Sequence, residues 1–491
     1  MPLRTLHSLR HPNSGRSGTP SRERTGVSTA NPAASPSAAP ARDDRFGLLL
    51  TLVMWVQLGN MILTFDWADS TQAVLNGFEA DSTNRMIKIA LLLISAIVVF
   101  ARMRITTQVL RQTNRFFLVF LLLVPASILW SIDRGVTAAR CVTLASMTMV
   151  CLAFSVGAWN PRRYQNVVLA VITFVLLASL IVGMINPAYV IEKGTDISLK
   201  NSWHGLAAQK NLFGMVASLG TIFWVHAWLS RRDHRLLAVV GMAISFSCLL
   251  LSRSSTSLMA TLFSSVLLLL LLRSPPSLRR YRPYLIALFA AMVILYGCAV
   301  MKFIPGTEFL LSPITALTGK DTTFSARTDI WAIVRENIQL HPYLGSGYNA
   351  YWGGGPVPSS PSYQFLARMY FWPSETHNGY LEIRNDLGLP GVFILFGFLY
   401  VYLRQALYLM KFDRAQAGLF LALFFQQAIV NLFESAWLSV DNYNFVTIGA
   451  ATFYMSRSLY EYRRSSVPMA APDRTPARTK PSSIYARITP S

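Results

Sequence analysis

The sequence predicts an all-α polytopic membrane protein with about twelve transmembrane helices. Hydrophobic residues make up 53% of its 491 residues and charged residues only 14%, well below the quarter that is usual for soluble domains. The apolar residues fall in long runs, most of which reach the roughly 17–25 residues that a membrane helix needs. The four cysteines lie inside these runs and are expected to be small buried side chains, not zinc ligands or disulfides.

Composition divides the chain into five parts. Residues 1–44 and 464–491 are rich in Ser, Pro, Ala and Arg and show no hydrophobic period, so we expect disordered tails. Residues 45–302 hold spans one to nine, 303–388 form one long polar loop with short helices, and 389–463 hold spans ten to twelve. The spans are predicted at 46–65, 86–102, 116–131, 138–158, 164–187, 211–230, 236–252, 256–272, 284–302, 389–409, 417–438 and 443–458.

The placement of the arginines predicts the orientation. The net charge of +21 comes from Arg and Lys in the tails and in short loops such as 102–115 and 231–235. This distribution is typical of membrane orientation and argues against nucleic-acid binding. The alternate loops hold fewer cations, and the first of them, 66–84, is acidic. Cation-rich loops stay in the cytoplasm. We therefore expect both tails to be cytoplasmic, and the loops at 188–210, around 253 and at 303–388 to face outward.

Three outward segments carry polar residues that could do chemistry. In the first, Lys210 and Asn211 begin an apolar helix near His204, and a cation beside a helix N-terminus favours an anionic ligand. In the second, Arg253 lies among hydroxyls between two apolar runs, where its planar fork suits phosphate oxygens. The structural alternative for both cations is an ordinary residue at the membrane interface.

The third segment is the long loop. Ser325 can cap an amphipathic helix in which Ile330, Val334 and Ile338 share one face, and Arg327 lies in its first turn. His377 follows in ETHNGY, and an imidazole that titrates near neutrality suits a general base for a sugar hydroxyl. A solvated arginine and a packing histidine are the structural alternatives.

The chain has no Walker A motif, no HExxH and no carboxylate pair of the DxD kind. We therefore expect neither a metal nor a cofactor, because fixed cations can stabilise a leaving phosphate without one.

Four motifs together resemble the O-antigen ligase and polysaccharide polymerase superfamily, most closely its exopolysaccharide-production polymerase-like members. They are QKNLFG (209–214), SRSSTSL (252–258), FSARTDIW (324–331) with HPYLGSGYNAYW (341–352), and HNGYLEIRNDLGLPG (377–391). The likeness runs over about 200–458. It implies a GT-C-like fold in the bacterial inner membrane, with the long loop in the periplasm.

The resemblance also implies an activity. Members transfer a glycan from undecaprenyl diphosphate to an acceptor hydroxyl, without a metal and with inversion. Two arginines and a histidine carry over as the catalytic Arg253, Arg327 and His377. The further candidates for binding substrate are Lys210, Asn211, His204, Asn378 and Glu382. Glu375 or Glu382 could orient the imidazole, and the sequence leaves that choice open.

Several alternatives remain at this stage. A ligase would move finished glycan onto lipid A core or a protein, and a flippase or other transporter also fits about twelve spans. A transporter would need charges inside the membrane, for which Glu434 is the main candidate. A protein that serves only as a structural scaffold would not need cations gathered on the outward face of the membrane. Beyond the lipid-linked glycan and membrane lipid, a chain-length regulator and export proteins are possible partners.

Overall fold

The computed structural model describes residues 44–63, 82–192, 201–230, 234–300, 325–353, 358, 360–369, 373, 375–440 and 442–466. Most of the two predicted tails, the start of the long loop and the Gly-rich stretch at 354–357 lie outside these residues. Within the described chain the structure is helical, with an isolated antiparallel bridge between Ile191 and Trp203.

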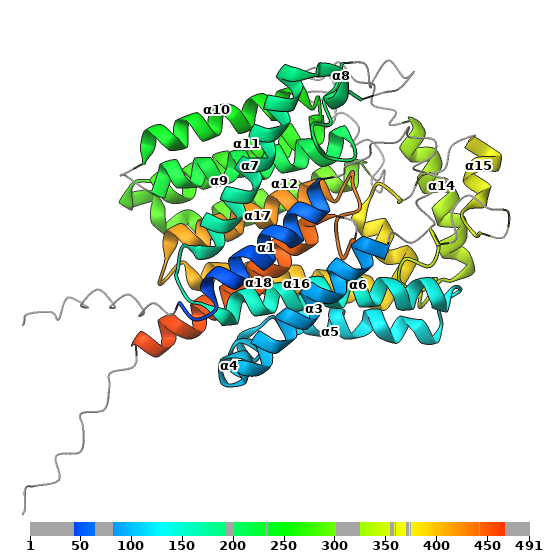
Figure 1. The fold of residues 1–491 in the computed structure, drawn as a ribbon, viewed down its shortest axis with the longest axis horizontal. Helices are drawn as coiled ribbons and strands as arrows, with labels where there is room; N and C mark the ends of the chain where they lie inside the picture. The colour runs from blue at the N-terminus through cyan, green and yellow to red at the C-terminus, as the bar shows by residue number, and fades with distance from the viewer. Residues whose placement is uncertain are drawn as a thin grey trace, which may run out of the picture. The chain divides into compact units, whose positions relative to one another are not determined.

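Each predicted apolar run overlaps a helix (Figure 1). The helices are α1 (Gly47–Ile62), α3 (Ser82–Ala101), α4 (Met103–Gln112), α5 (Arg115–Ala126), α6 (Arg134–Gly157), α7 (Arg163–Ile185), α8 (Pro187–Val190), α9 (Lys210–Ser230), α10 (Arg235–Leu251), α11 (Ser255–Arg273), α12 (Arg282–Val300), α14 (Ser325–Leu340), α15 (Tyr363–Met369), α16 (Gly379–Leu409), α17 (Arg414–Val430) and α18 (Tyr443–Ser466). Two 3-10 turns, η1 (Ser127–Leu129) and η2 (Pro276–Tyr281), complete the described elements.

Six of these helices are long and apolar enough to cross a membrane, and a seventh span is possible if α3 and the bent α4 count as one. Three further apolar helices are shorter: α1, α5 with η1, and α10. The chain is thus a multi-pass helical membrane protein. Two predicted boundaries need correction. Residues 103–112, predicted as a loop, form α4, and the span predicted at 417–438 ends as a helix at Val430.

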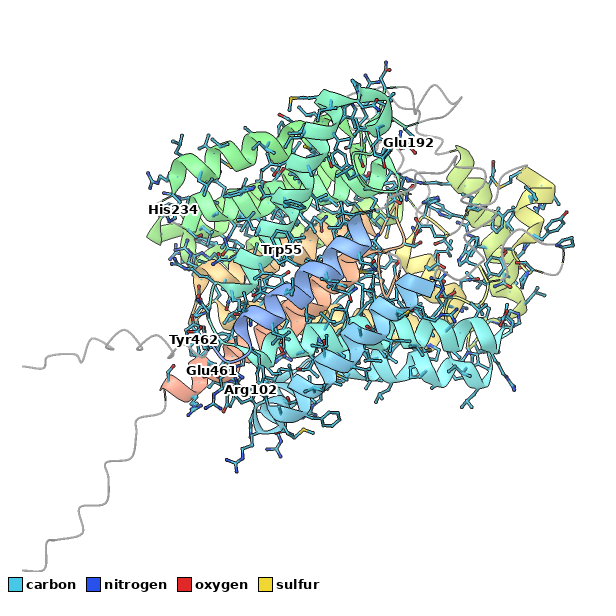
Figure 2. All side chains as sticks on the ribbon, in the orientation of Figure 1. Trp55, Arg102, Glu192, His234, Glu461 and Tyr462 are labelled. Atoms are coloured by element: carbon cyan, nitrogen blue, oxygen red, sulfur yellow. The ribbon has the colours of Figure 1, made fainter. Side chains whose placement is uncertain are left out.

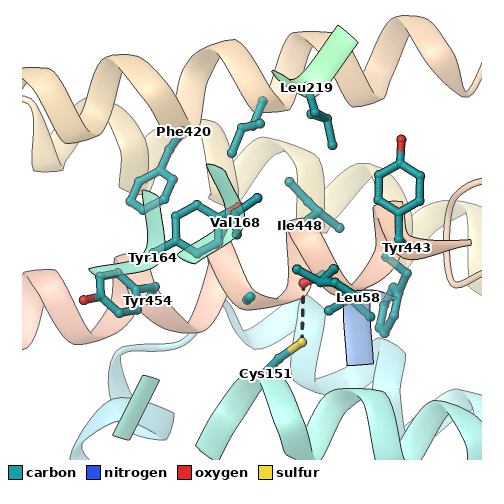
Figure 3. Packing of buried hydrophobic residues seen from close by; sticks show 14 of the residues in the cluster. Leu58, Cys151, Tyr164, Val168, Leu219, Phe420, Tyr443, Ile448 and Tyr454 are labelled. Atoms are coloured by element: carbon teal, nitrogen blue, oxygen red, sulfur yellow. Dashed lines mark hydrogen bonds between the residues drawn. The ribbon is translucent and has the colours of Figure 1, made fainter. Parts of the chain in front are cut away.

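The helices pack on large buried aromatic side chains (Figure 3). The ring of Tyr164 on α7 lies 5.8 Å from Phe420 of α17 and 5.9 Å from Tyr454 of α18. Cys151 donates from Sγ to the Val446 carbonyl at 3.4 Å. Cys151 and Cys248 are buried and free, as predicted, whereas Cys141 and Cys298 are half-buried.

Contacts between loops define two ends of the bundle. At one end, His226 lies 2.8 Å from the Ala415 carbonyl, and Gln416 donates to the Pro161 carbonyl at 2.7 Å. At the other end, Trp203 donates its backbone N–H to Leu251 at 3.0 Å. Figure 2 shows His234, Arg102 and Glu461 at the first end and Glu192 at the other. These contacts place the loops near Pro161 and Ala415 at one end of the bundle and the segments near Trp203 and Leu251 at the other.

A glycine lets part of the long loop dock on α16. Gly388 interrupts α16 with φ 64° and ψ −153°, and the Leu389 N–H donates to the Tyr343 carbonyl at 2.8 Å. A Cβ on Gly388 would lie 2.0 Å from that same carbonyl oxygen. The 341–347 turn can approach the helix because this position has no side chain.

Gly388→Ala is expected to lower the melting temperature of the detergent-purified protein. The backbone at φ 64° and ψ −153° is essentially restricted to glycine and costs another residue about 1–3 kcal/mol, and the Cβ would push the 341–347 turn away. Gly59→Ala on α1 is the matched control, since its Cβ meets nothing within 4 Å. Equal melting temperatures for the two variants would contradict the docking role.

Candidate active site

The carboxylate of Glu434 is the centre of a polar cluster at the end of the bundle opposite the cation-rich loops. It lies in the turn after α17, and its side chain is only 4% exposed. Its Oε1 accepts hydrogen bonds from Nη2 of Arg327 and Nδ2 of Asn211, both at 2.9 Å. Its Oε2 lies 3.4 Å from Nδ1 of His377. The start of α9, the start of α14 and the segment before α16 therefore meet on one side chain.

A second carboxylate shares the same imidazole nitrogen. Oε1 of Glu375 lies 3.0 Å from Nδ1 of His377. Burial disfavours the charged imidazole, but the hydrogen bonds and negative charges of Glu375 and Glu434 outweigh burial and raise the pKa of His377 to about 10. His377 is therefore an imidazolium at neutral pH in the free protein.

The charge of Glu434 is held by the same contacts. Burial would raise the pKa of this carboxyl, but the hydrogen bond to His377 and the charge of Arg327 keep it below its usual value. Arg327 thus provides a compensating charge that a buried carboxylate needs.

The backbone at His377 is left-handed, with φ 52°. Its two neighbours hold it there. The side chain of Asn378 caps α16 by accepting from the backbone N–H groups of Tyr380 and Leu381, and its Nδ2 donates to the Leu432 carbonyl at 3.1 Å. Asn378 is buried, so its role here is to fix the backbone that presents His377.

Glu382, in the first turn of α16, fixes Thr376, the residue before His377. Its carboxylate accepts from the Thr376 backbone N–H at 2.8 Å, from Ser435 Oγ at 3.1 Å and from Trp352 Nε1 at 2.6 Å. Thr376 and Ser435 adjoin His377 and Glu434 in sequence. Of the two carboxylates considered for orienting the imidazole, Glu375 contacts it, whereas Glu382 ties together the two segments that carry the cluster.

Helix α14 positions Arg327. The predicted amphipathic helix forms, with Ile330 and Val334 buried against the bundle. One turn after Arg327, Trp331 donates from Nε1 to the Thr376 carbonyl at 3.0 Å. The guanidinium carbon of Arg327 is 5.6 Å from the centroid of the Phe433 ring. The arginine is 22% exposed, so one side of it can still meet a ligand.

Arg253 lies in an adjacent turn. It is exposed, joins α10 to α11 and has φ 50°, a conformation that costs a non-glycine residue energy. A Cβ on Gly214, in the first turn of α9, would lie 2.6 Å from Cβ of Ser254. The Arg253 turn therefore packs against the part of α9 that carries Asn211.

The remaining predicted residues have local partners. Lys210 is buried, and its backbone N–H donates to Oε2 of Glu192 at 3.1 Å. The anionic group predicted at the start of α9 is therefore supplied by the protein itself. Nδ1 of His204 lies 3.0 Å from the Ala207 carbonyl, a contact within its own turn.

Sequence reasoning missed the role of Glu434. It treated this residue as a charge inside the span predicted at 417–438, but α17 ends at Val430 and the chain then turns. The available signal was a lone acidic residue at the end of an apolar run, which needs a partner. Its partners come from positions far away in the sequence, so the pattern does not reveal them.

The same cluster could hold a metal ion by geometry. Glu375, His377 and Glu434 each offer a ligand atom, and these atoms lie within 4.8 Å of one another. Metal binding would require Nδ1 of His377 to lose its proton, and the ion would compete with Arg327 for Glu434. The guanidinium and the imidazolium already balance the carboxylate charge.

Fold and site together define a multi-pass helical membrane protein with a charged, largely buried cluster at one end of its bundle. Residues 240–396 match the model of the O-antigen ligase family, which confirms the predicted resemblance over a segment that contains Arg253, Arg327 and His377. A curated relative is the exopolysaccharide production protein ExoQ of Rhizobium meliloti (strain 1021), which is 28% identical over 254 residues. That match covers 50% of this chain and 55% of the relative, so the chain spans about half the length of that protein. Glu434 and Asn211 lie outside the family segment.

Glu434→Gln is expected to make His377 more reactive toward diethyl pyrocarbonate, which modifies neutral imidazole. Loss of one carboxylate lowers the pKa of His377 from about 10 toward its ordinary 6.5, so modification at pH 7 should be at least about tenfold faster. Mass spectrometry of the 375–384 peptide measures the rate. An unchanged rate would mean that Glu434 does not hold the proton on the imidazole.

Proposed function

We propose that this protein is a glycosyltransferase that polymerises oligosaccharide repeat units carried on undecaprenyl diphosphate, at the periplasmic face of the bacterial inner membrane, in exopolysaccharide synthesis. The observation that carries the proposal is the convergence of Arg327, His377 and Asn211 on one buried carboxylate. The match to the O-antigen ligase model and the similarity to an exopolysaccharide production protein support it.

In this proposal the arginines bind the donor diphosphate. Arg327 exchanges the Glu434 carboxylate for phosphate oxygens, and the exposed Arg253 approaches from the neighbouring turn, with Lys210 adding charge. Guanidinium groups bind phosphate bidentately and are always charged, so they can stabilise the leaving diphosphate without a metal.

The acceptor hydroxyl then attacks the anomeric carbon from the face opposite the diphosphate. The new glycosidic bond forms as the bond to the diphosphate oxygen breaks, and the electron pair leaves with the phosphate. His377 accepts the hydroxyl proton. Both carboxylates contact Nδ1, which leaves Nε2 for the substrate, and the imidazolium must lose its Nε2 proton before it can act as a base.

The proposed topology rests on the difference in charge between the two ends of the bundle. The cation-rich end is assigned to the cytoplasm by the positive-inside rule, together with both termini. The site end then faces the periplasm, in a twelve-span GT-C-like plan in which α14 and α15 form part of the outward loop. This orientation brings the site to the membrane surface where a lipid-linked donor presents its diphosphate.

A ligase that transfers glycan to lipid A core or protein uses the same donor chemistry and differs only in its acceptor. The position of Glu434 argues against a transporter. Glu434, the charge that would favour it, lies past the end of α17 and is bound by Arg327 and His377. A chain-length regulator or export protein as partner remains part of the polymerase hypothesis.

His377→Ala is expected to reduce polymer formation by roughly 10²–10⁴-fold, the contribution of a general base. The assay follows lipid-linked glycan by gel in membranes with matched protein levels. Longer lipid-linked chains in the wild type identify a polymerase, and labelled acceptor identifies a ligase. His341→Ala in the same loop is the control, and full activity of His377→Ala would remove His377 as the base.

Arg327→Lys keeps the charge but loses the planar fork, so activity should fall on the order of 10²-fold. The same gel assay measures it. Arg335→Lys, on the exposed face of the same helix, should behave as the wild type. If the Arg327→Lys variant supports normal turnover, bidentate binding of the diphosphate is wrong.

The pH dependence follows from the raised pKa of His377. Its protonated form dominates below about 10, so kcat/KM should rise with pH between 7 and 9, by about tenfold per pH unit for a single deprotonation. A flat profile over this range would indicate that a carboxylate, and not His377, takes the proton.

A further inference from the structure

Two cations lie over one aromatic ring at the end of the bundle opposite the candidate active site. The guanidinium carbon of Arg463, in the last turn of α18, is 5.0 Å from the centroid of the Tyr408 ring, and Nζ of Lys411 is 5.3 Å from it. Arg463 also donates from Nη1 to Oε1 of Gln112 at 2.6 Å, which brings the end of α4 to the same place. Arg111 precedes Gln112 and is exposed. Like charges gathered around one ring favour a bound anion.

The nearest acidic side chains are engaged elsewhere. Oδ1 of Asp413 accepts from the Gln416 backbone N–H, and Oδ2 accepts from the Tyr462 hydroxyl, both at 2.9 Å. Glu461 pairs with Arg457 at 2.6 Å. Among the ion pairs of the described residues, none includes Lys411, Arg463 or Arg111. The anion that suits these cations therefore has to come from outside the described chain.

Helix α4 has the geometry of a helix at a membrane surface. It turns by 95° from α3, so it lies across that helix and does not continue it. Thr106 and Val109 face the protein, while Arg104 and Arg111 are exposed. In Figure 1, α4 and the red end of α18 lie at the same end of the bundle. An amphipathic helix with exposed arginines lies at the level of the lipid headgroups.

An apolar stripe leads from the cations along α16. Phe393, Phe396 and Tyr400 are 71%, 55% and 60% exposed. They share a face at spacings of three and four residues. Tyr408 lies further along this face, and Arg404 lies between, with its guanidinium carbon 5.8 Å from the centroid of the Tyr400 ring. From Phe396 to Tyr408 the helix rises about 18 Å, close to the roughly 15 Å of hydrocarbon in one leaflet. The stripe thus matches an acyl chain whose headgroup lies at Tyr408.

We propose that Lys411, Arg463 and Arg111 bind the headgroup phosphate of an anionic phospholipid, whose acyl chain lies on Phe396 and Tyr400. The headgroup satisfies the two cations at the Tyr408 ring, and Arg111 lies beside Gln112, which Arg463 contacts. The bound lipid joins the ends of α4, α16 and α18 at the face opposite the site. This lipid site is independent of the proposed enzymatic activity.

The test titrates the full-length, detergent-purified protein with phosphatidylglycerol and measures the dissociation constant from the shift in melting temperature. The double variant Lys411→Gln, Arg463→Gln is expected to bind roughly tenfold to thirtyfold more weakly. Phosphatidylcholine and soluble glycerol 3-phosphate are expected to bind at least about tenfold more weakly to the wild type, since one lacks net charge and the other the acyl chains.

Arg335→Gln, an exposed arginine of α14 at the other end of the bundle, is the matched control and should keep the wild-type affinity. If the double variant melts earlier without lipid, Lys411→Gln alone repeats the comparison, with a weakening of at least about threefold expected. Equal affinity of variant and wild type overturns the proposal. Equal affinity for phosphatidylcholine, or for glycerol 3-phosphate, also overturns it.

Discussion

Burial of the Glu434 carboxylate constrains the whole end of the bundle that carries the candidate active site. An ionised carboxylate removed from water costs several kcal/mol unless cations and donors compensate it. Arg327, Asn211 and His377 supply that compensation from three elements. The turn that carries Glu434 is itself fixed, because Oδ1 of Asn431 accepts from the backbone N–H groups of Ala436 and Trp437 at 2.9 and 2.8 Å. Packing of α9, α14 and α16 at this end is therefore coupled to one charge.

The same contacts set the protonation of His377 and the partner of Arg327 in the absence of substrate. Two carboxylates on one imidazole nitrogen keep His377 protonated, and Arg327 is held by a carboxylate that a phosphate can replace. Arg253 and His377 both have left-handed backbone conformations. Such conformations persist only where the surroundings enforce them, and they are frequent at functional sites. The hydrogen bonds of Thr376, Asn378 and Glu382 provide that enforcement around His377.

The cationic side chains are arranged differently at the two ends of the bundle. At the site end, each cation of the central cluster meets a carboxylate, so the cluster is compact and largely buried. At the other end, Arg104, Arg111, Lys411 and Arg463 are exposed around α4 and the end of α18. We propose that the first arrangement binds a ligand that displaces a carboxylate and that the second binds anionic headgroups.

The sequence by itself determined the helical membrane fold and the positions of the apolar helices, and it singled out Arg327 and His377 as candidate site residues. These rest on local properties: hydropathy over one helix length, the period of α14 and scarce polar residue types between apolar runs. Tertiary structure decided the rest. Three features depend on neighbours distant in sequence: α17 ends at Val430, Glu375 and not Glu382 contacts the imidazole, and Glu192 occupies the start of α9. A carboxylate becomes the centre of a site only when folding buries it beside its cations, and no local pattern records which cations those are.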